Sequence, residues 1–208
     1  MPHLILIRHG QTDWNSDHRF QGTTDVPLND HGRAQAFALA AQLADETLGY
    51  AFSSDLSRAW ETGSIVTDCH DVELVPEARL RETSFGQWEG LRGSQVMETY
   101  PELIRSWRSN PFVTTPPGGE PLSEAISRVE SLLADLRQLP DDATVLLSAH
   151  GAIHRTLICA AIGLPHANRW NLSLRETSVS RIDLTPTRAV LNLLNDTRHL
   201  DRIAALNA

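Results

Sequence analysis

The chain has 208 residues, of which 41% are hydrophobic and 21% charged, a size and composition typical of one globular domain spanning 1–208. Collagen-like, disordered and disulfide-scaffold proteins are excluded, because a chain of this length and composition can bury a full core of its own. The net charge of −8 at pH 7 gives no reason to expect nucleic acid or an anionic membrane as a partner, so any anion site must be a local basic cluster.

The sequence predicts a cytoplasmic protein. It contains no run of about eighteen apolar residues, and Arg8 interrupts the N-terminal apolar run too soon for a secretory signal. Cys69 and Cys159 are far apart and belong to no metal-ligand motif, so we expect two free thiols in a reducing compartment. We therefore expect neither a membrane partner nor a metal site.

Alternating strand and helix signals predict an α/β fold, expected as a three-layer sandwich with a mostly parallel central sheet and helices on both faces. The run 3–7 (HLILI) is short and apolar, as in a buried strand, and it ends at Arg8. Asn29 is a suitable N-cap for a helix that runs to Leu43. The pattern then predicts a strand over 50–52, a helix that opens at the turn 53–55 and a further strand near 73–75.

From about residue 81 to 121 the pattern loosens, because glycine and proline interrupt short helical pieces that carry Trp88, Trp107 and Phe112. We expect an excursion over about 83–120 that forms a lid over a site. The alternative is a surface subdomain with its own small aromatic cluster. The last expected elements are a helix with Pro121 at its N1 position, a strand over 144–148, a helix after Gly151, and a hairpin of 179–184 and 189–193 at a sheet edge.

Two of these strands end in similar motifs, Arg8-His9-Gly10 after the first and His150-Gly151 after the strand over 144–148. In a parallel sheet both histidines emerge at the carboxyl edge, where α/β sheets bind ligands. Arg58 follows another strand and its turn, so a second guanidinium can face this edge. Arginine offers a rigid fork of donors suited to phosphate oxygens. An arginine taken singly is more often part of a surface salt bridge.

Five motifs occur in a fixed order between about residues 4 and 160. They are Arg8-His9-Gly10-Gln11-Thr12 with Asn15 and then Gln21-Gly22; Ser53-Ser54-Asp55-Leu56-Ser57-Arg58-Ala59; Leu80-Arg81-Glu82 with Trp88-Glu89-Gly90; Gly118-Gly119-Glu120; and His150-Gly151. This series resembles the histidine phosphatase superfamily, also called phosphoglycerate mutase-like, whose signature is RHGxTxxN. The chain departs from the family's pattern at Pro121, where a serine often follows Gly-Gly-Glu.

The resemblance implies a metal-independent phosphoryl transfer without a cofactor, in which His9 is the nucleophile and becomes a phosphohistidine. Arg8, Arg58 and His150 would surround the non-bridging oxygens, where positioning and electrostatic stabilisation supply most of the catalysis. An alkoxide leaves poorly without a proton, and Glu82 is the candidate acid, which later activates water as a base.

By the same resemblance the substrate-binding residues are Asn15, Gln21, Gly22 and the backbone N–H of Gly151. The remaining histidines have no defensible ligand partners, so surface or helix-face roles are expected for His18, His31 and His154. Candidate walls of the substrate pocket are Trp14, Arg81, Arg105, Trp107 and Trp170, with the arginines reading a carboxylate and the tryptophans a sugar or ring face.

The resulting hypothesis is a phosphomonoesterase acting on small phosphorylated metabolites. Only 68 positions separate Glu82 from His150, which favours a phosphatase over a cofactor-dependent phosphoglycerate mutase with its longer insertion. The sequence also allows a non-catalytic phosphate-binding regulatory module or a secreted phytase-like enzyme. The family's substrates include phosphoserine, α-ribazole phosphate, 3-phosphoglycerate and its glucosylated form, and sugar phosphates, and the sequence leaves this choice open. A homodimer through an edge strand would be unsurprising.

Overall fold

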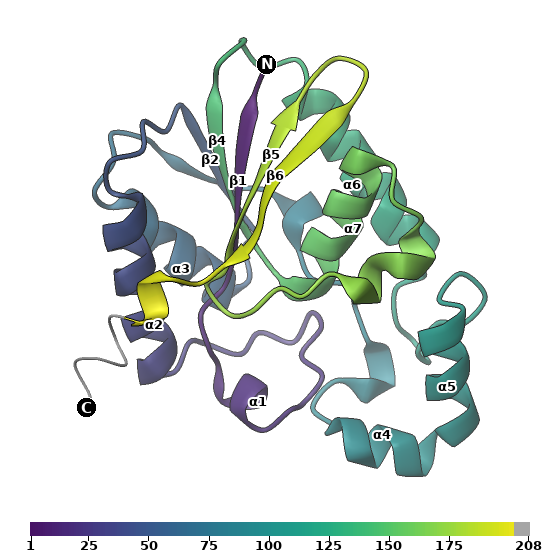
Figure 1. Ribbon diagram of the computed structural model, residues 1–208. Coiled ribbons are helices and arrows are strands. Elements are labelled where there is room, and N and C mark those ends of the chain that lie inside the picture. The colour runs from purple at the N-terminus through teal and green to yellow at the C-terminus, as the bar shows by residue number, and fades with distance from the viewer. Residues whose placement is uncertain (202–208) are drawn as a thin grey trace.

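The computed structural model describes residues 1–201, which fold around one six-stranded sheet with the order β3-β2-β4-β1-β5-β6 (Figure 1). The strands are β1 His3–Arg8, β2 Tyr50–Ser53, β3 Leu74–Pro76, β4 Thr144–Ala149, β5 Val179–Leu184 and β6 Ala189–Asp196. Strands β1, β2, β3 and β4 pair in parallel, while β5 and β6 are antiparallel. The predicted α/β fold with a mostly parallel sheet is confirmed.

Strand β1 lies near the centre of the sheet and is buried on both faces, which explains its continuous apolar run. Leu4 and Leu6 pack with the core that contains Val129 and Leu157. Ile5 and Ile7 point the other way, into the core that contains Leu39. Because side chains alternate along a strand, a run without polar residues is what a strand covered on both faces needs.

Helices cover both faces of this sheet, with α2 and α3 on one side and α6 and α7 on the other (Figure 1). Their bounds are α2 Asp30–Leu43, α3 Ser57–Thr67, α6 Leu122–Leu136 and α7 Gly151–Ile162. Asn29 caps α2 as predicted, since its Oδ1 accepts from the N–H of Gly32 at 2.8 Å. The prediction for Pro121 is wrong by one position. It is the N-cap of α6, and Leu122 is the first helical residue, because extended ψ of 141° keeps the proline outside the helix.

The excursion between β3 and α6 contains the short helices η1 Ala78–Leu80 and η2 Gly86–Trp88, then α4 Gly93–Thr99 and α5 Pro101–Ser109. It has its own aromatic core, in which Phe85, Trp88 and Trp107 pack edge to face. Bridges join it to the loop after α1 Asp13–Ser16. The excursion thus has the aromatic cluster of the subdomain interpretation and also borders the site described below.

The remaining predictions concern the C-terminal part and the cysteines. Strands β5 and β6 form the expected hairpin, with β6 at the sheet edge, after η3 His166–Asn171. Cys69 and Cys159 are both free thiols, the first exposed and the second buried. Within residues 1–201, no helix has the length and apolar character needed to cross a membrane.

Candidate active site

The two histidines of the sequence motifs meet at the carboxyl edge of the sheet. Because β1 and β4 are parallel neighbours with Arg8 opposite Ala149, His9 and His150 leave the sheet side by side. Their ring centroids are 5.1 Å apart and both side chains are buried. The structure thus brings together the pair that sequence spacing predicted.

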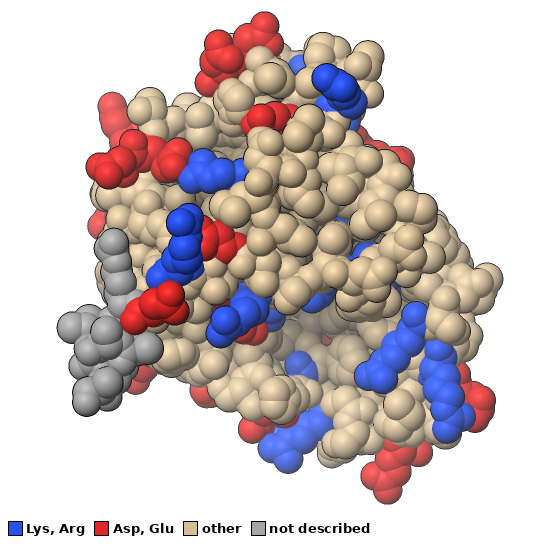
Figure 2. Space-filling model, viewed as in Figure 1, with Lys and Arg blue, Asp and Glu red and all other residues tan. Residues whose placement is uncertain are grey.

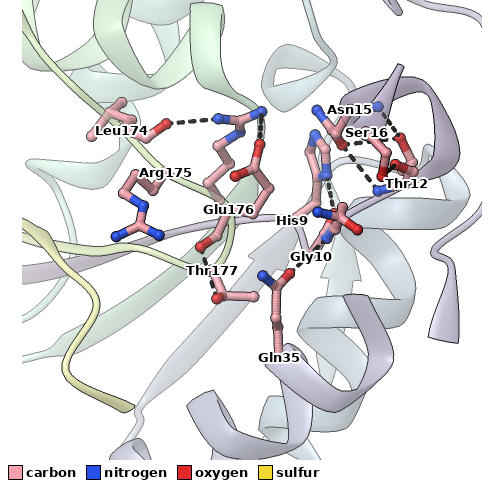
Figure 3. Close-up of polar contacts among 12 residues, drawn as sticks. His9, Gly10, Thr12, Asn15, Ser16, Gln35, Leu174, Arg175, Glu176 and Thr177 are labelled. Carbon is pink, nitrogen blue, oxygen red and sulfur yellow. Dashed lines mark hydrogen bonds and ion pairs between the residues drawn. The ribbon is translucent and has the colours of Figure 1, made fainter. Parts of the chain in front are cut away.

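His9 is held as a neutral imidazole with one free ring nitrogen. Its Nδ1 donates to the carbonyl of Gly10 at 2.7 Å, which directs the Nε2 lone pair away from that bond (Figure 3). Burial lowers the pKa of His9 well below 6.5, and the guanidiniums of Arg58 and Arg8 act in the same direction. A neutral ring with a fixed orientation is what a nitrogen nucleophile requires.

Arg58 is completely buried and is fixed by the loop that precedes α2. Its Nη1 donates to the carbonyl of Thr24 at 2.9 Å and its Nη2 to that of Gly22 at 2.7 Å. Gly22 has a positive φ of 56°, and a Cβ atom there would lie 2.1 Å from the carboxylate of Glu89. Burial lowers the pKa of Arg58 to about 10, so the side chain keeps its charge at neutral pH.

His150 is oriented by Ser54, which lies at the end of β2. The Ser54 hydroxyl oxygen accepts from the N–H of Leu56 at 3.3 Å and lies 2.8 Å from Nε2 of His150. Both tautomers satisfy these two contacts, because a hydroxyl can donate once and accept twice; with the proton on Nδ1, the Ser54 hydroxyl donates to Nε2 and leaves an Nδ1–H for a ligand. Burial lowers the pKa of His150 well below 6.5, with Arg58 and His9 contributing.

Three buried nitrogens near His9 have no hydrogen-bond partner among residues 1–201. They are Nε of Arg8, Nε of Arg58 and Nδ1 of His150. Leaving a buried donor unpaired costs about 1–3 kcal/mol, so such atoms call for an explanation. Arg8 and Arg58 line the same cleft as His9, and the ring of His150 lies beside that of His9, so an oxyanion bound there is the candidate partner of these nitrogens.

Glu82 joins this site through the N-terminus of α7. Its Oε2 accepts from the N–H of Ala152 and its Oε1 from that of Ile153, both at 3.0 Å, while the N–H of Thr83 also reaches Oε1 at 2.9 Å. The first turn of a helix offers N–H groups without intrahelical partners, which is why a carboxylate from another segment can dock there. The adjacent Gly151 begins the same helix.

The predicted substrate-binding residues Asn15, Gln21, Gly22 and Gly151 all line one cleft of about 570 Å³ with His9. Asn15 forms a capping box with Thr12. The N–H and the hydroxyl of Thr12 both donate to Oδ1 of Asn15. The cleft is far larger than a phosphate group. It therefore has room for the body of a substrate as well as for the phosphate.

Five arginines and one acid, Glu82, are among the described residues that line this cleft, although the protein as a whole is acidic. The arginines are Arg8, Arg19, Arg58, Arg108 and Arg155. Figure 2 shows arginine side chains in blue around a hollow in the lower half of the molecule. The cleft is therefore a local basic cluster of the kind that an anion site in an acidic protein needs.

The walls of the cleft differ in part from those predicted. Trp107 and Trp170 line it together with Phe20 and Phe85. The three remaining candidates do not: Trp14 packs against Gly90, Arg81 pairs with Asp55, and Arg105 pairs with Glu102. Arg105 and Glu102 lie one helical turn apart, and the sequence alone does not show whether such an arginine forms an ion pair within its helix or faces a pocket.

Three cleft arginines were missed by the sequence analysis, namely Arg19, Arg108 and Arg155. Arg155 was within reach of sequence reasoning, because it lies four residues after Gly151 on α7 and so on the same helical face. Its Nε donates to the carbonyl of Leu172 at 2.8 Å and its guanidinium lies 5.5 Å from the ring centroid of Trp170. No carboxylate within residues 1–201 forms an ion pair with Arg155 or Arg108.

The three histidines expected to lie outside the site differ in their exposure. His18 and His31 are exposed, as expected, whereas His154 is buried on α7 and burial lowers its pKa to about 3. Of the surface and helix-face roles expected for His154, the helix-face role applies, because it lies on the face of α7 that packs inward. In the described part of the chain, no group of three His, Cys, Asp or Glu side chains is arranged to hold a metal ion.

Comparison with known proteins agrees with this geometry. The sequence profile of the histidine phosphatase superfamily (branch 1) matches residues 4–197. The chain belongs to this superfamily. It is 34% identical to phosphoserine phosphatase 1 of Hydrogenobacter thermophilus, over 96% of this chain and 95% of that protein. It is 32% identical to a Klebsiella pneumoniae protein named "Probable phosphoglycerate mutase GpmB", over 97% and 96% of the two chains.

Among solved structures, the fold is similar to that of the mycobacterial glucosyl-3-phosphoglycerate phosphatase in complex with VO3. The TM-score is 0.85, with 33% identity over 93% of this chain and 98% of that one. Superfamily membership and these phosphatase relatives identify the chain as a phosphoric monoester hydrolase that acts on small metabolites.

Proposed function

We propose that this hydrolase is metal-independent and works through a phosphohistidine at His9. The observation that carries the proposal is the buried, neutral His9 ring, whose Nε2 is free beside the unpartnered nitrogens of Arg8, Arg58 and His150. Those groups supply the positive charge and the donors that phosphoryl transfer needs. The excursion over about 83–120 would act as the lid of a single domain over 1–208.

In the first step Nε2 of His9 attacks phosphorus, the bond from phosphorus to the ester oxygen breaks, and Glu82 as its carboxylic acid donates a proton to the leaving oxygen. In the second step the Glu82 carboxylate accepts a proton from water, whose oxygen attacks phosphorus. The bond from phosphorus to Nε2 then breaks and inorganic phosphate leaves. Glu82 suits both steps because it is the acid that lines the cleft beside His9.

The remaining site residues would bind the phosphoryl group and the substrate. Arg8, Arg58 and His150 donate to the non-bridging oxygens, and the N–H of Gly151 adds the positive end of α7. Asn15, Gln21 and Gly22 would contact the group from the opposite loop. Their support is their position along the same cleft as His9.

The test is phosphate release from p-nitrophenyl phosphate by the parent, His9→Ala and the matched control His31→Ala, an exposed histidine on α2. We expect the His9 variant to lose activity by at least 10³-fold and the control to retain it, with EDTA without effect on the parent. Rapid quenching with ³²P-labelled substrate should trap an acid-labile, base-stable phosphoenzyme in the parent alone. Retained turnover in His9→Ala, or a requirement for added metal, would overturn the proposal.

A mutase and a regulatory module can be tested with the same preparation. A mutase would interconvert phosphoglycerates when supplied with a bisphosphate, and the short spacing between Glu82 and His150 favours hydrolysis instead. A regulatory module would bind phosphate without turnover. It is disfavoured because the nucleophile, both arginines, the second histidine and the acid are all present and assembled.

The walls of the cleft favour a substrate that carries a second acidic group. Arg155 and Arg108 lie in the cleft without an ion-pair partner within residues 1–201, and Trp107 and Trp170 contribute apolar wall to it. The named relatives act on phosphoserine and glucosyl-3-phosphoglycerate, and both substrates contain a carboxylate. We propose that this enzyme also hydrolyses a phosphorylated acid of this class.

Matched substrate pairs test this preference. In 3-phosphoglycerate and glycerol 3-phosphate, or in phosphoserine and phosphoethanolamine, the ester is the same and only the acid differs. We expect the parent to have at least tenfold higher kcat/KM for the acid of a pair, and Arg155→Met to remove most of that difference. Arg105→Met is the control, because Arg105 lies outside the cleft. Equal kcat/KM values within both pairs would refute the preference.

A cytoplasmic location and a homodimer remain predictions. Two free thiols fit the reducing cytoplasm, and β6 at the sheet edge is the strand through which a second copy would pair. Cell fractionation and light scattering of the purified protein would test the two predictions.

A further inference from the structure

A turn between η3 and β5, residues 174–177, lies against Arg8 and is not used by the mechanism above. The guanidinium of Arg8 donates through Nη1 to the carbonyl of Leu174 at 2.7 Å, and its Nη2 lies 2.9 Å from Oε1 of Glu176 (Figure 3). Both terminal nitrogens of the guanidinium are thus engaged by this turn. The segment is far from Arg8 in sequence, so only the fold creates these contacts.

These two contacts decide which edge of the guanidinium remains for a ligand. Nε is buried and has no partner within residues 1–201. It lies near the first residue of α7, since a Cβ atom on Gly151 would be 3.5 Å from it. A guanidinium is planar and rigid, so fixing both Nη atoms also fixes the direction of the Nε–H bond. The turn therefore sets how Arg8 meets an anion at the start of α7.

The turn is itself bound to the nucleophile strand and to the C-terminal segment. The N–H of Thr177 donates to the carbonyls of Arg8 and His9, at 3.1 and 3.3 Å. Thr177 has a positive φ of 53°, which is unfavourable for a residue with a branched Cβ. Its hydroxyl oxygen lies 3.0 Å from Nε2 of the buried His199. Asn195 at the end of β6 accepts from the N–H of Arg175 at 2.7 Å.

We propose that the 174–177 turn is a positioning element for Arg8, with Glu176 as the positioning residue that holds Nη2. The inference rests on the proposed role of Arg8 in binding the phosphoryl group. Glu176 reaches Arg8 and not the substrate, so it acts through the guanidinium. By holding that side of Arg8, it keeps the Nε–H directed toward the phosphoryl oxygens as charge redistributes in the transition state.

A plain surface ion pair is the competing interpretation. The side chains of Arg8 and Glu176 are 17% and 26% exposed, so the pair alone contributes little to the stability of the fold. The two interpretations differ in what a substitution changes. An ion pair with a purely structural role would leave kcat unchanged when Glu176 is replaced, whereas the loss of a positioning residue lowers kcat.

The experiment compares the parent, Glu176→Ala, Glu176→Gln and the matched control Arg175→Ala with p-nitrophenyl phosphate. Arg175 is the exposed neighbour in the same turn, and its side chain forms no ion pair within residues 1–201. We expect Glu176→Ala to lower kcat by at least tenfold with less than a threefold change in KM. Glu176→Gln keeps an acceptor for Nη2, so it should recover most of that loss.

Inhibition by inorganic phosphate provides a second readout, which separates the charge of Glu176 from its contact with Arg8. Glu176→Gln keeps the contact but removes a negative charge beside Arg8, so its Ki for phosphate should fall by about threefold or more. The Ki of Arg175→Ala should not fall, because that substitution removes a positive charge.

The inference would be overturned if Glu176→Ala turned over substrate like the parent, if Gln were as damaging as Ala, or if Arg175→Ala lost as much activity. Failure of the proposed function has a different signature. In that case His9→Ala would remain active with p-nitrophenyl phosphate whatever the Glu176 variants do.

Discussion

The carboxylate of Glu89 joins the two loops that border the cleft, and Glu89→Gln tests this link. One oxygen, Oε1, accepts from the N–H groups of Thr23 and Phe85 at 3.1 and 3.0 Å and from the Ser84 hydroxyl at 3.1 Å. The second oxygen, Oε2, accepts from the N–H of Thr24 at 3.0 Å and from the Thr24 hydroxyl. A Gln amide replaces one acceptor by a donor, so at least one backbone N–H loses its partner.

The expected cost follows from these contacts. A hydrogen bond to a charged group is worth about 1.5–3 kcal/mol, and the remaining bonds weaken when the acceptor becomes neutral, which gives a loss of about 3 kcal/mol. For a domain of this size that lowers the melting temperature by roughly 6–12 °C. The loop with Gln21 and Gly22 should also loosen, because the next two residues, Thr23 and Thr24, donate to Glu89. We therefore expect a higher KM as well.

The assay is thermal melting followed by circular dichroism, with Glu46→Gln as the control. Glu46 forms a partly exposed pair with Arg181 at 2.6 Å, and its loss should cost less than about 1 kcal/mol. A melting temperature of Glu89→Gln within about 2 °C of the parent, or an equal loss in the control, would refute the reasoning.

The pH dependence of the same variant gives a further check. Burial acts to raise the pKa of Glu89, but the hydrogen bonds from Thr24, Thr23, Phe85 and Ser84 outweigh it and hold the pKa below 4.5. A carboxyl with a depressed folded-state pKa stabilises the fold above its unfolded pKa, and this contribution is lost as pH falls through the folded value. The difference between parent and variant should therefore shrink below about pH 4.

Three more predictions concern protonation and backbone. Because the pKa of His9 is lowered, the kcat/KM profile of the parent for p-nitrophenyl phosphate should show no inflection near pH 6.5 on its acid limb; an inflection there would contradict this. Burial lowers the pKa of His154 to about 3, so below pH 6.5 this residue takes up a proton on unfolding and the free energy of unfolding falls. In urea titrations, the fall in the free energy of unfolding between pH 7 and about pH 4.5 should be about 3 kcal/mol smaller for His154→Leu than for the parent. Gly86→Ala should destabilise the protein by about 2 kcal/mol or more in the same titrations, because φ is +53° and the new Cβ would lie 2.2 Å from the carbonyl oxygen of Pro117; an unchanged midpoint would exclude this crowding.

Much of the geometry of the candidate site could be predicted from the sequence, because it depends on where strands end. An apolar run such as 3–7 is typical of a strand covered on both faces, and parallel strands have one common carboxyl edge. The residues that follow β1 and β4 therefore had to meet, and the rings of His9 and His150 do. Asn29 capped its helix as predicted, because capping depends on residues within one turn.

What the sequence left open depends on contacts between segments that are distant in the chain. Trp14, Arg81 and Arg105 were reasonable pocket walls by residue type, but distant partners hold Trp14 and Arg81 elsewhere, and Arg105 pairs with Glu102 in the same helix. Arg108 lines the cleft only because α5 packs where it does. No local pattern distinguishes an arginine that faces a cleft from one that faces water.

The sequence by itself thus determined the α/β class, the order of the strands along the chain and the position of the His9-Gly10 and His150-Gly151 motifs at strand ends, since short-range spacing and alternation encode them. Only the tertiary structure decided that Glu82 docks on the first turn of α7, that Glu89 joins two loops, and that Glu176 holds Arg8. The physical reason is that a carboxylate binds whichever N–H or guanidinium the packing of the layers brings within about 3 Å. That proximity is a property of the folded chain rather than of neighbouring residues.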